Sequence, residues 1–141
     1  SKRQVMIITI DKLSSEPIYL QIRTQIIAAI AKGRMAPGDS LPSVRALARD
    51  LGVNLHTVNK AYAVLQDEGY VCMNGRRGTM IARRTPQSDR SMLEDLERKT
   101  FEELERLSTE FAARGGTRES FLKLAEQAAA GIEGTSKSEE D

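Results

Sequence analysis

Near its N-terminus the chain has a short run of β-branched residues and then an apolar pattern of helical spacing. Residues 5–10 (VMIITI) predict a short strand, because β-branched side chains favour extended backbone. From Pro17, which is well tolerated at the first position of a helix, apolar residues recur three or four apart until Gly33 supplies a stop. The apolar positions of this predicted helix are Ile18, Ile22, Ile26, Ala29 and Ile30.

Two shorter helices are predicted next, and each begins at a residue that can cap it. Ser43 can cap the second helix, which ends at Gly52, and Asn54 can cap the third, which ends at Gly69. Ala48 is small, and Gly52 adopts a positive φ at low cost, so the two helices can cross closely after a short turn. The spacing therefore predicts a helix-turn-helix. Its apolar positions are Val44, Leu47, Ala48, Leu51, Val53, Val58, Ala61, Tyr62 and Leu65.

The pattern then changes from helical to alternating. Residues 70–73 and 79–82 predict two short strands, and residues 74–78 (NGRRG) between them have the composition of a hairpin tip. Residues 83–88, with Pro86, predict a linker. A hairpin that follows a helix-turn-helix in this way is typical of a wing.

Two amphipathic helices are predicted after the linker. The first runs to a Gly-Gly pair at residues 115–116, Thr117 can cap the second, and residues 134–141 are polar enough to fray. Two such helices cannot bury both apolar stripes by themselves, so we expect a second copy to cover them in a symmetric homodimer. The alternative is that this tail folds back on its own head. The predicted dimerisation residues are Leu93, Leu96, Leu104, Leu107, Phe111, Phe121, Leu124 and Ala128.

These elements predict a mainly α fold with a small β-hairpin. We expect a winged helix-turn-helix head over residues 1–84 and a two-helix dimerisation tail over residues 85–141. Charge divides in the same way. Residues 1–85 carry 13 Lys and Arg against 6 Asp and Glu, hence +7, whereas residues 86–141 carry 8 against 14, hence −6. A basic head on an acidic tail predicts that only the head binds a polyanion.

Composition argues against several other classes. With one His and one Cys, the chain offers no nucleophile-base pair and no metal-ligand cluster, so we expect no enzyme, cofactor or metal. No apolar run approaches the roughly 20 residues that a membrane span needs, and we expect a cytoplasmic protein without membrane contact. Cys72 lies in an apolar stretch and is expected to be a buried structural thiol. The sequence identifies no small-molecule effector.

The third predicted helix keeps hydrogen-bonding side chains on its outer face. A helix fits the major groove of duplex DNA, where Asn pairs with adenine and Thr, His or Lys reach base edges or phosphates. The exposed arginines of the hairpin tip, Arg76 and Arg77, can reach a phosphate or the minor groove. The alternative is an ordinary solvated helix face. The outer-face residues are Asn54, His56, Thr57, Asn59 and Lys60.

Several motifs in residues 7–82 resemble one family of bacterial regulators. They are PIYLQI at residues 17–22, PGDSLPSVR at 37–45, LGVN at 51–54, TV at 57–58, KAY at 60–62 and EGY at 68–70. The sequence is similar to the GntR family, and most of all to its YtrA subfamily. That resemblance implies a winged-helix head, a short two-helix tail and, in most members, repression of transcription. A nonspecific DNA-binding or protein-binding winged helix is the alternative.

The resemblance also implies which residues contact double-stranded DNA. Two departures from the family pattern are Leu55, where many relatives have arginine or proline, and Arg76, which stands at the first glycine of the usual wing motif. The operator sequence therefore does not follow from the family. The implied contacts are Ser43 and Arg45 in the second helix, Asn54, His56, Thr57, Asn59 and Lys60 in the third, and Arg77, Gly78 and Thr79 in the wing.

Overall fold

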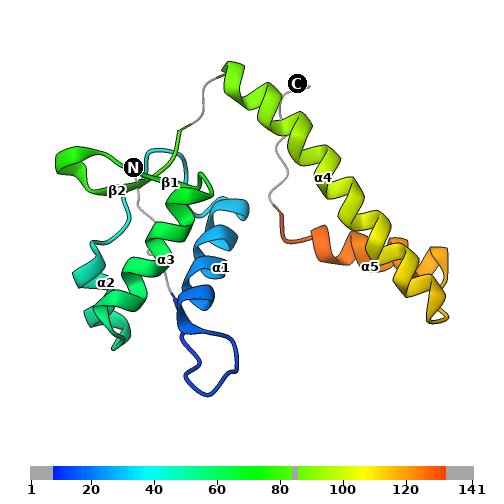
Figure 1. Ribbon diagram of the computed structural model, residues 1–141, viewed down its shortest axis with the longest axis horizontal. Helices are drawn as coiled ribbons and strands as arrows, with labels where there is room; N and C mark the ends of the chain where they lie inside the picture. The colour runs from blue at the N-terminus through cyan, green and yellow to red at the C-terminus, as the bar shows by residue number, and fades with distance from the viewer. Residues whose placement is uncertain (1–7, 84–85, 133–141) are drawn as a thin grey trace. The chain divides into compact units, whose positions relative to one another are not determined.

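The computed structural model describes residues 8–83 and 86–132 (Figure 1). The chain divides into two compact units, Ser1–Arg83 and Arg84–Asp141. The described ranges hold five α-helices and a two-stranded antiparallel sheet, which is the predicted mainly α fold with one hairpin. In chain order the elements are α1 (Ile18–Ala31), α2 (Val44–Leu51), α3 (Leu55–Asp67), β1 (Val71–Met73), a 3-10 turn (Gly75–Arg77), β2 (Thr79–Ile81), α4 (Pro86–Ala113) and α5 (Arg118–Ala129).

The predicted N-terminal strand is wrong in its described part, residues 8–10, and its first three residues lie outside the described ranges. Side-chain amides from α1 occupy the backbone groups that a neighbouring strand would use. The Thr9 N–H donates to Gln25 Oε1 (2.9 Å), and Gln25 Nε2 donates to the Thr9 carbonyl (2.7 Å). Buried Gln21 makes the same pair of bonds with Asp11, at 2.9 and 3.0 Å. The segment is therefore held against α1 instead of in a sheet.

The helix boundaries differ slightly from the predicted ones. Pro17 precedes α1 as its N-cap instead of occupying its first helical position. α4 already begins at Pro86, inside the predicted linker, and α5 ends at Ala129. Proline favours a helix start because its fixed φ suits the first turn and its missing N–H needs no partner there. The predicted frayed end at residues 134–141 lies outside the described ranges.

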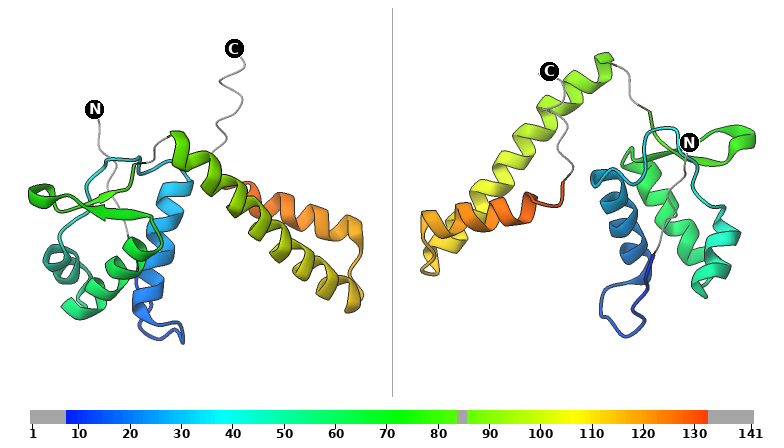
Figure 2. Two further views of the ribbon diagram at one scale, coloured as in Figure 1. Left: turned by 45° about the horizontal axis from the view of Figure 1, so that its top comes forward. Right: turned by 180° about the vertical axis from the view of Figure 1, so that it is seen from behind.

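The hairpin of β1 and β2 is anchored to the connection between α1 and α2. Val71 pairs with Ile81 and Met73 with Thr79 across the hairpin, and an isolated bridge joins Met80 to Ser40 on the other side of β2. The tip projects away from the three helices (Figure 2). Cys72 lies on β1, at the outer side of this arrangement, and is exposed. The prediction of a buried thiol is therefore wrong, because successive side chains of a strand point to opposite sides, and the side of β1 that faces the core is taken by buried Val71.

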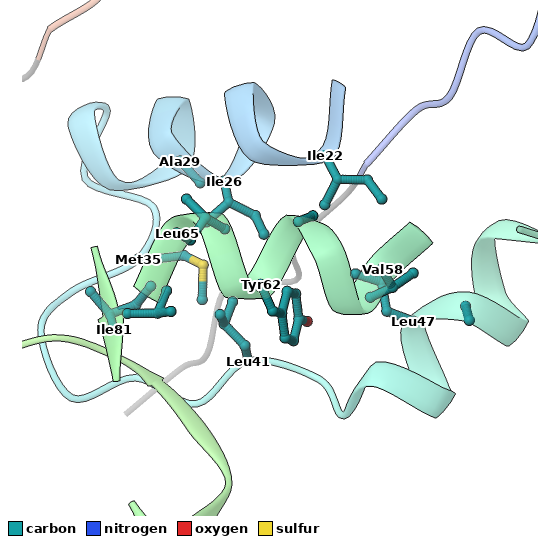
Figure 3. Packing of buried hydrophobic residues seen from close by; sticks show 13 residues of the cluster. Ile22, Ile26, Ala29, Met35, Leu41, Leu47, Val58, Tyr62, Leu65 and Ile81 are labelled. Atoms are coloured by element: carbon teal, nitrogen blue, oxygen red, sulfur yellow. The ribbon is translucent and has the colours of Figure 1, made fainter. Parts of the chain in front are cut away.

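The hydrophobic core lies between α1 and α3, with α2 closing one end and the hairpin the other (Figure 3). Ile22 and Ile26 of α1 face the inner side of α3, where Val58 and Leu65 are fully buried. Leu47 of α2 lies next to Val58 in the same view. Each of these large aliphatic side chains stabilises the fold by about 1.5–3 kcal/mol through burial. The inner side of α3 is consequently fixed, and its other side is left facing outward.

Tyr62 of α3 links this core to the backbone that leads into α2. Its ring is buried, and its hydroxyl donates to the carbonyl of Pro42 at 2.8 Å. Pro42 directly precedes Ser43, the N-cap of α2. Burial raises the pKa of the Tyr62 phenol above its ordinary value, because the phenolate would lose its hydration. The hydrogen bond therefore ties α3 to the start of α2.

The second unit consists of a long helix and a short one. α4 has 28 residues and α5 has 12, so at 1.5 Å per residue they are roughly 42 and 18 Å long. Phe111 of α4 and Phe121 of α5 meet near their connection, with ring centroids 5.8 Å apart. Leu93 and Leu96, at the far end of α4, are 53% and 55% exposed. None of the described helices is long and apolar enough to cross a bilayer.

Replacing Tyr62 with Phe tests the tie between α3 and α2. We expect Tyr62→Phe to lower the free energy of unfolding at pH 7 by about 1 kcal/mol, because the carbonyl of Pro42 loses its donor. The raised pKa means that the parent loses stability once the pH exceeds the ordinary tyrosine value of 10.0, where only the unfolded chain releases the proton. Urea unfolding from pH 7 to 11 measures the difference in free energy of unfolding between the parent and Tyr62→Phe. We expect this difference to become smaller above pH 10. A constant difference would contradict the assignment.

Candidate nucleic-acid interface

Side-chain caps and one glycine set where α2 and α3 begin and how they turn. Ser43 Oγ accepts from the Ala46 N–H (3.0 Å), and Asn54 Oδ1 accepts from the His56 N–H (2.7 Å). Gly52 ends α2 with φ +69°, a left-handed conformation that costs other residues about 1 kcal/mol or more. The sequence-based prediction of both caps and of this turn is confirmed. The starts of both helices are thus fixed by contacts within a few residues of the chain and do not depend on a ligand.

A hollow of about 350 Å³ lies at the N-terminal ends of α2 and α3. The structure brings four of the predicted DNA contacts together around it, two from each helix. They are Ser43, Arg45, His56 and Asn59, and the apolar side chains of Val44 and Leu55 complete the lining. Donors, acceptors and a positive charge in one concave region match the edges of base pairs and their flanking phosphates.

The other predicted residues of α3 are placed differently. Asn54 is exposed, but its side-chain oxygen is engaged in the cap, so a bidentate bond to adenine would compete with that hydrogen bond. Asn59 is exposed and lines the hollow. Thr57 is half-buried. Of the two asparagines, Asn59 is the one whose position suits adenine recognition.

Lys60 lies on the side of α3 that faces α1. Its Nζ is 4.2 Å from the centroid of the Tyr19 ring, close enough for a cation–π contact. At the other end of α3, Arg23 Nε pairs with Glu68 Oε1 at 2.8 Å, and this hydrogen bond raises the pKa of Arg23. Lys60 is exposed, yet it does not line the hollow. It can serve the flank of the interface as a phosphate contact, whereas Asn59 faces its centre.

The wing places its predicted residues unequally. Arg76 is exposed at the tip, and Gly78 turns the chain with φ +75°. Thr79 is only 8% exposed, and its hydroxyl donates to Met73 Sδ at 3.0 Å. The side chain of Thr79 therefore does not reach the surface, and it packs against Met73, its partner across the hairpin. The side chain of Arg77 lies outside the described parts of the structure.

Sequence reasoning did not identify Leu55 as part of this surface. Leu55 stands three residues before Val58 and so continues the apolar spacing of α3, which favours burial. In the structure it is 38% exposed and lines the hollow beside His56 and Asn59. Only the family departure noted at this position drew attention to it, and that signal did not specify a role.

A helix-turn-helix with an outward-facing second helix and an adjoining hairpin defines a winged-helix regulator of transcription. Comparison with known proteins identifies the family. Residues 18–81 match the family described as bacterial regulatory proteins, gntR family. The HTH-type transcriptional regulator YhcF of Bacillus subtilis is 35% identical over 111 residues, which cover 78% of this chain and 88% of YhcF. The chain therefore belongs to the GntR family.

Two proteins named YtrA support the YtrA subfamily. The HTH-type transcriptional repressor YtrA of Bacillus subtilis is 49% identical over 75 residues, or 53% of this chain and 58% of that protein. The structure of YtrA from Sulfolobus acidocaldarius, a GntR-family transcription factor, is 46% identical and has a TM-score of 0.53 over 67% of this chain and 97% of that one. The chain spans about three fifths of the length of the Bacillus repressor. Regulators of this family bind DNA.

Proposed function

We propose that the protein is a sequence-specific repressor that binds a palindromic operator as a homodimer. The observation that carries this proposal is the hollow at the starts of α2 and α3, which gathers Arg45, His56 and Asn59 on the outward side of a helix-turn-helix. Sequence reading requires such hydrogen-bonding groups in the major groove, whereas phosphate binding alone requires only positive charge. The repressor activity is inferred from the name of the related Bacillus protein.

The charges of the two units support a head that binds DNA and a tail that does not. The head carries a net charge of +7 up to residue 85, and the tail carries −6. A duplex therefore attracts the head and repels the tail. Arg76 at the exposed wing tip extends the positive surface beyond the helices and is suited to a phosphate or the adjacent minor groove.

The tail supplies the second half of the proposal. α5 is too short to cover α4, and the stripe residues Leu93, Leu96, Leu104 and Leu107 are between 43% and 55% exposed. Burying such a stripe in a symmetric helix bundle is the usual reason for dimerisation of helical tails. The polar side of α4 carries ion pairs within the helix, such as Arg106 with Glu103 and Glu110, which remain satisfied in water. The apolar side is therefore the side that gains from a second copy.

Base reading by α2 is tested with a variant of Arg45. We expect Arg45→Ala to lower affinity for an operator selected from random duplexes by about 1–3 kcal/mol and to relax preference at one base pair, if Arg45 bonds to guanine. Arg34→Ala is the matched control, because it removes one exposed positive charge that does not line the hollow. Fluorescence anisotropy on operator and mismatched duplexes measures both effects. If the two variants showed the same affinity and the same base preference, Arg45 would not be part of the surface that contacts the bases.

The wing should behave differently from α2. Arg76→Ala is expected to weaken binding to every duplex alike, because a phosphate contact carries no sequence information. The slope of log K against log salt should become shallower by about 1. Titrations from 50 to 300 mM salt with operator and random DNA test this. A loss confined to the operator would instead assign Arg76 to base reading.

The tail prediction concerns oligomeric state. We expect the parent to sediment as a dimer at micromolar concentration and Leu96→Glu/Leu107→Glu to sediment as a monomer, since two charges would be buried in the bundle. Thr109→Glu, an exposed position on the side of α4 opposite the stripe, should leave the dimer intact. The monomer should bind a palindrome far more weakly while keeping half-site preference, because linkage of the two heads is lost. A monomeric parent would favour a tail that covers its own head.

A further inference from the structure

The hollow at the starts of α2 and α3 contains an apolar part that its polar residues do not explain. Val44 and Leu55 line it together with four hydrogen-bonding side chains. Leu55 is 38% exposed and is not among the side chains packed in the core. The part of the Leu55 side chain that stays in contact with water in the unbound protein therefore has a free-energy cost that burial against a ligand would remove.

Helix stability does not account for a leucine at this position either. Leu55 is the first residue of α3, directly after the cap Asn54. Proline and acidic residues are favoured in the first turn, because the turn has free N–H groups and the positive end of the helix dipole. Leucine contributes neither advantage. The side chain is therefore best explained by what it contacts when α3 is bound.

In the major groove, the apolar group that projects from a base edge is the 5-methyl group of thymine, whereas cytosine has only a hydrogen atom at that position. Every other base edge offers donors or acceptors, and covering these with leucine would leave them without partners at a cost of about 1–3 kcal/mol each. Leu55 stands between Asn54 and His56 at the N-terminal end of α3, the part of a recognition helix that contacts base edges. Val44 adds a second apolar surface on the α2 side of the same hollow.

We infer that Leu55 determines specificity by contacting a thymine methyl group in each operator half-site. This inference rests on the proposed function. The inference specifies one base of the operator that the proposed function leaves open, since the position facing Leu55 must be thymine. Both cytosine and a thymine without its methyl group are disfavoured there. The neighbouring side chains Asn59 and Arg45 then read the adjacent base pairs by hydrogen bonding.

The test first selects bound duplexes from a random pool with the full-length protein. Each thymine of the selected half-site is then replaced, one at a time, by deoxyuridine, which removes only the 5-methyl group and keeps every base-pairing group. We expect one position at which this replacement lowers affinity by on the order of fourfold, the equivalent of one buried methyl group. In Leu55→Ala, the same replacement should have no effect.

Leu13→Ala is the matched control, because Leu13 is 97% exposed and does not line the hollow. It should keep the parent's sensitivity to deoxyuridine, and thermal unfolding should show that both variants are folded. If selection enriches no sequence, the proposed function fails and the inference fails with it. If an operator emerges but no thymine shows a methyl effect, or the effect persists in Leu55→Ala, the proposed function stands and the role of Leu55 is overturned.

Discussion

The burial of one side of α3 is the constraint on which the rest of the head depends. Val58 and Leu65 are completely inaccessible to solvent, and they pack against Ile22 and Ile26 of α1. If such a helix rotated about its axis, its buried side chains would become exposed to water. Each large aliphatic side chain would then lose about 1.5–3 kcal/mol of favourable burial free energy. The direction in which the outer side chains point is therefore set by the core.

Polar contacts around this core determine where α2 and the wing lie relative to α3. The hydroxyl of Tyr62 holds the backbone before α2 through Pro42. The segment preceding that residue pairs with β2, since the Leu41 N–H donates to the Thr79 carbonyl (2.8 Å) and the Ile81 N–H donates to the Asp39 carbonyl (2.8 Å). One connection thus joins the recognition helix, its supporting helix and the wing. In the proposed function, such a rigid scaffold reduces the conformational entropy that is lost when DNA binds.

The two units meet different physical requirements. The head buries most of its large apolar residues in a core of its own, and in the proposed function its outer surface binds DNA. The tail has too little second helix to enclose the stripe on α4, so its free energy decreases when another surface covers Leu93 and Leu96. Dimerisation and palindrome recognition are thereby linked in the proposed function, because a twofold protein matches a twofold operator.

The sequence by itself determined the elements whose signals are local. The caps at Ser43, Asn54 and Thr117 and the turn at Gly52 were predicted from single residues, since a side-chain oxygen or a positive φ acts within a few residues of the chain.

Only the tertiary structure decided which side chains share a surface. Leu55 continues the apolar spacing of α3 but is exposed, Thr79 lies in an exposed-looking wing motif but is buried, and Cys72 is exposed. The backbone of Thr9 pairs with the side chain of Gln25 instead of with a strand. Burial depends on neighbours that are distant in the chain. The periodicity of one element does not indicate which of its residues those neighbours cover.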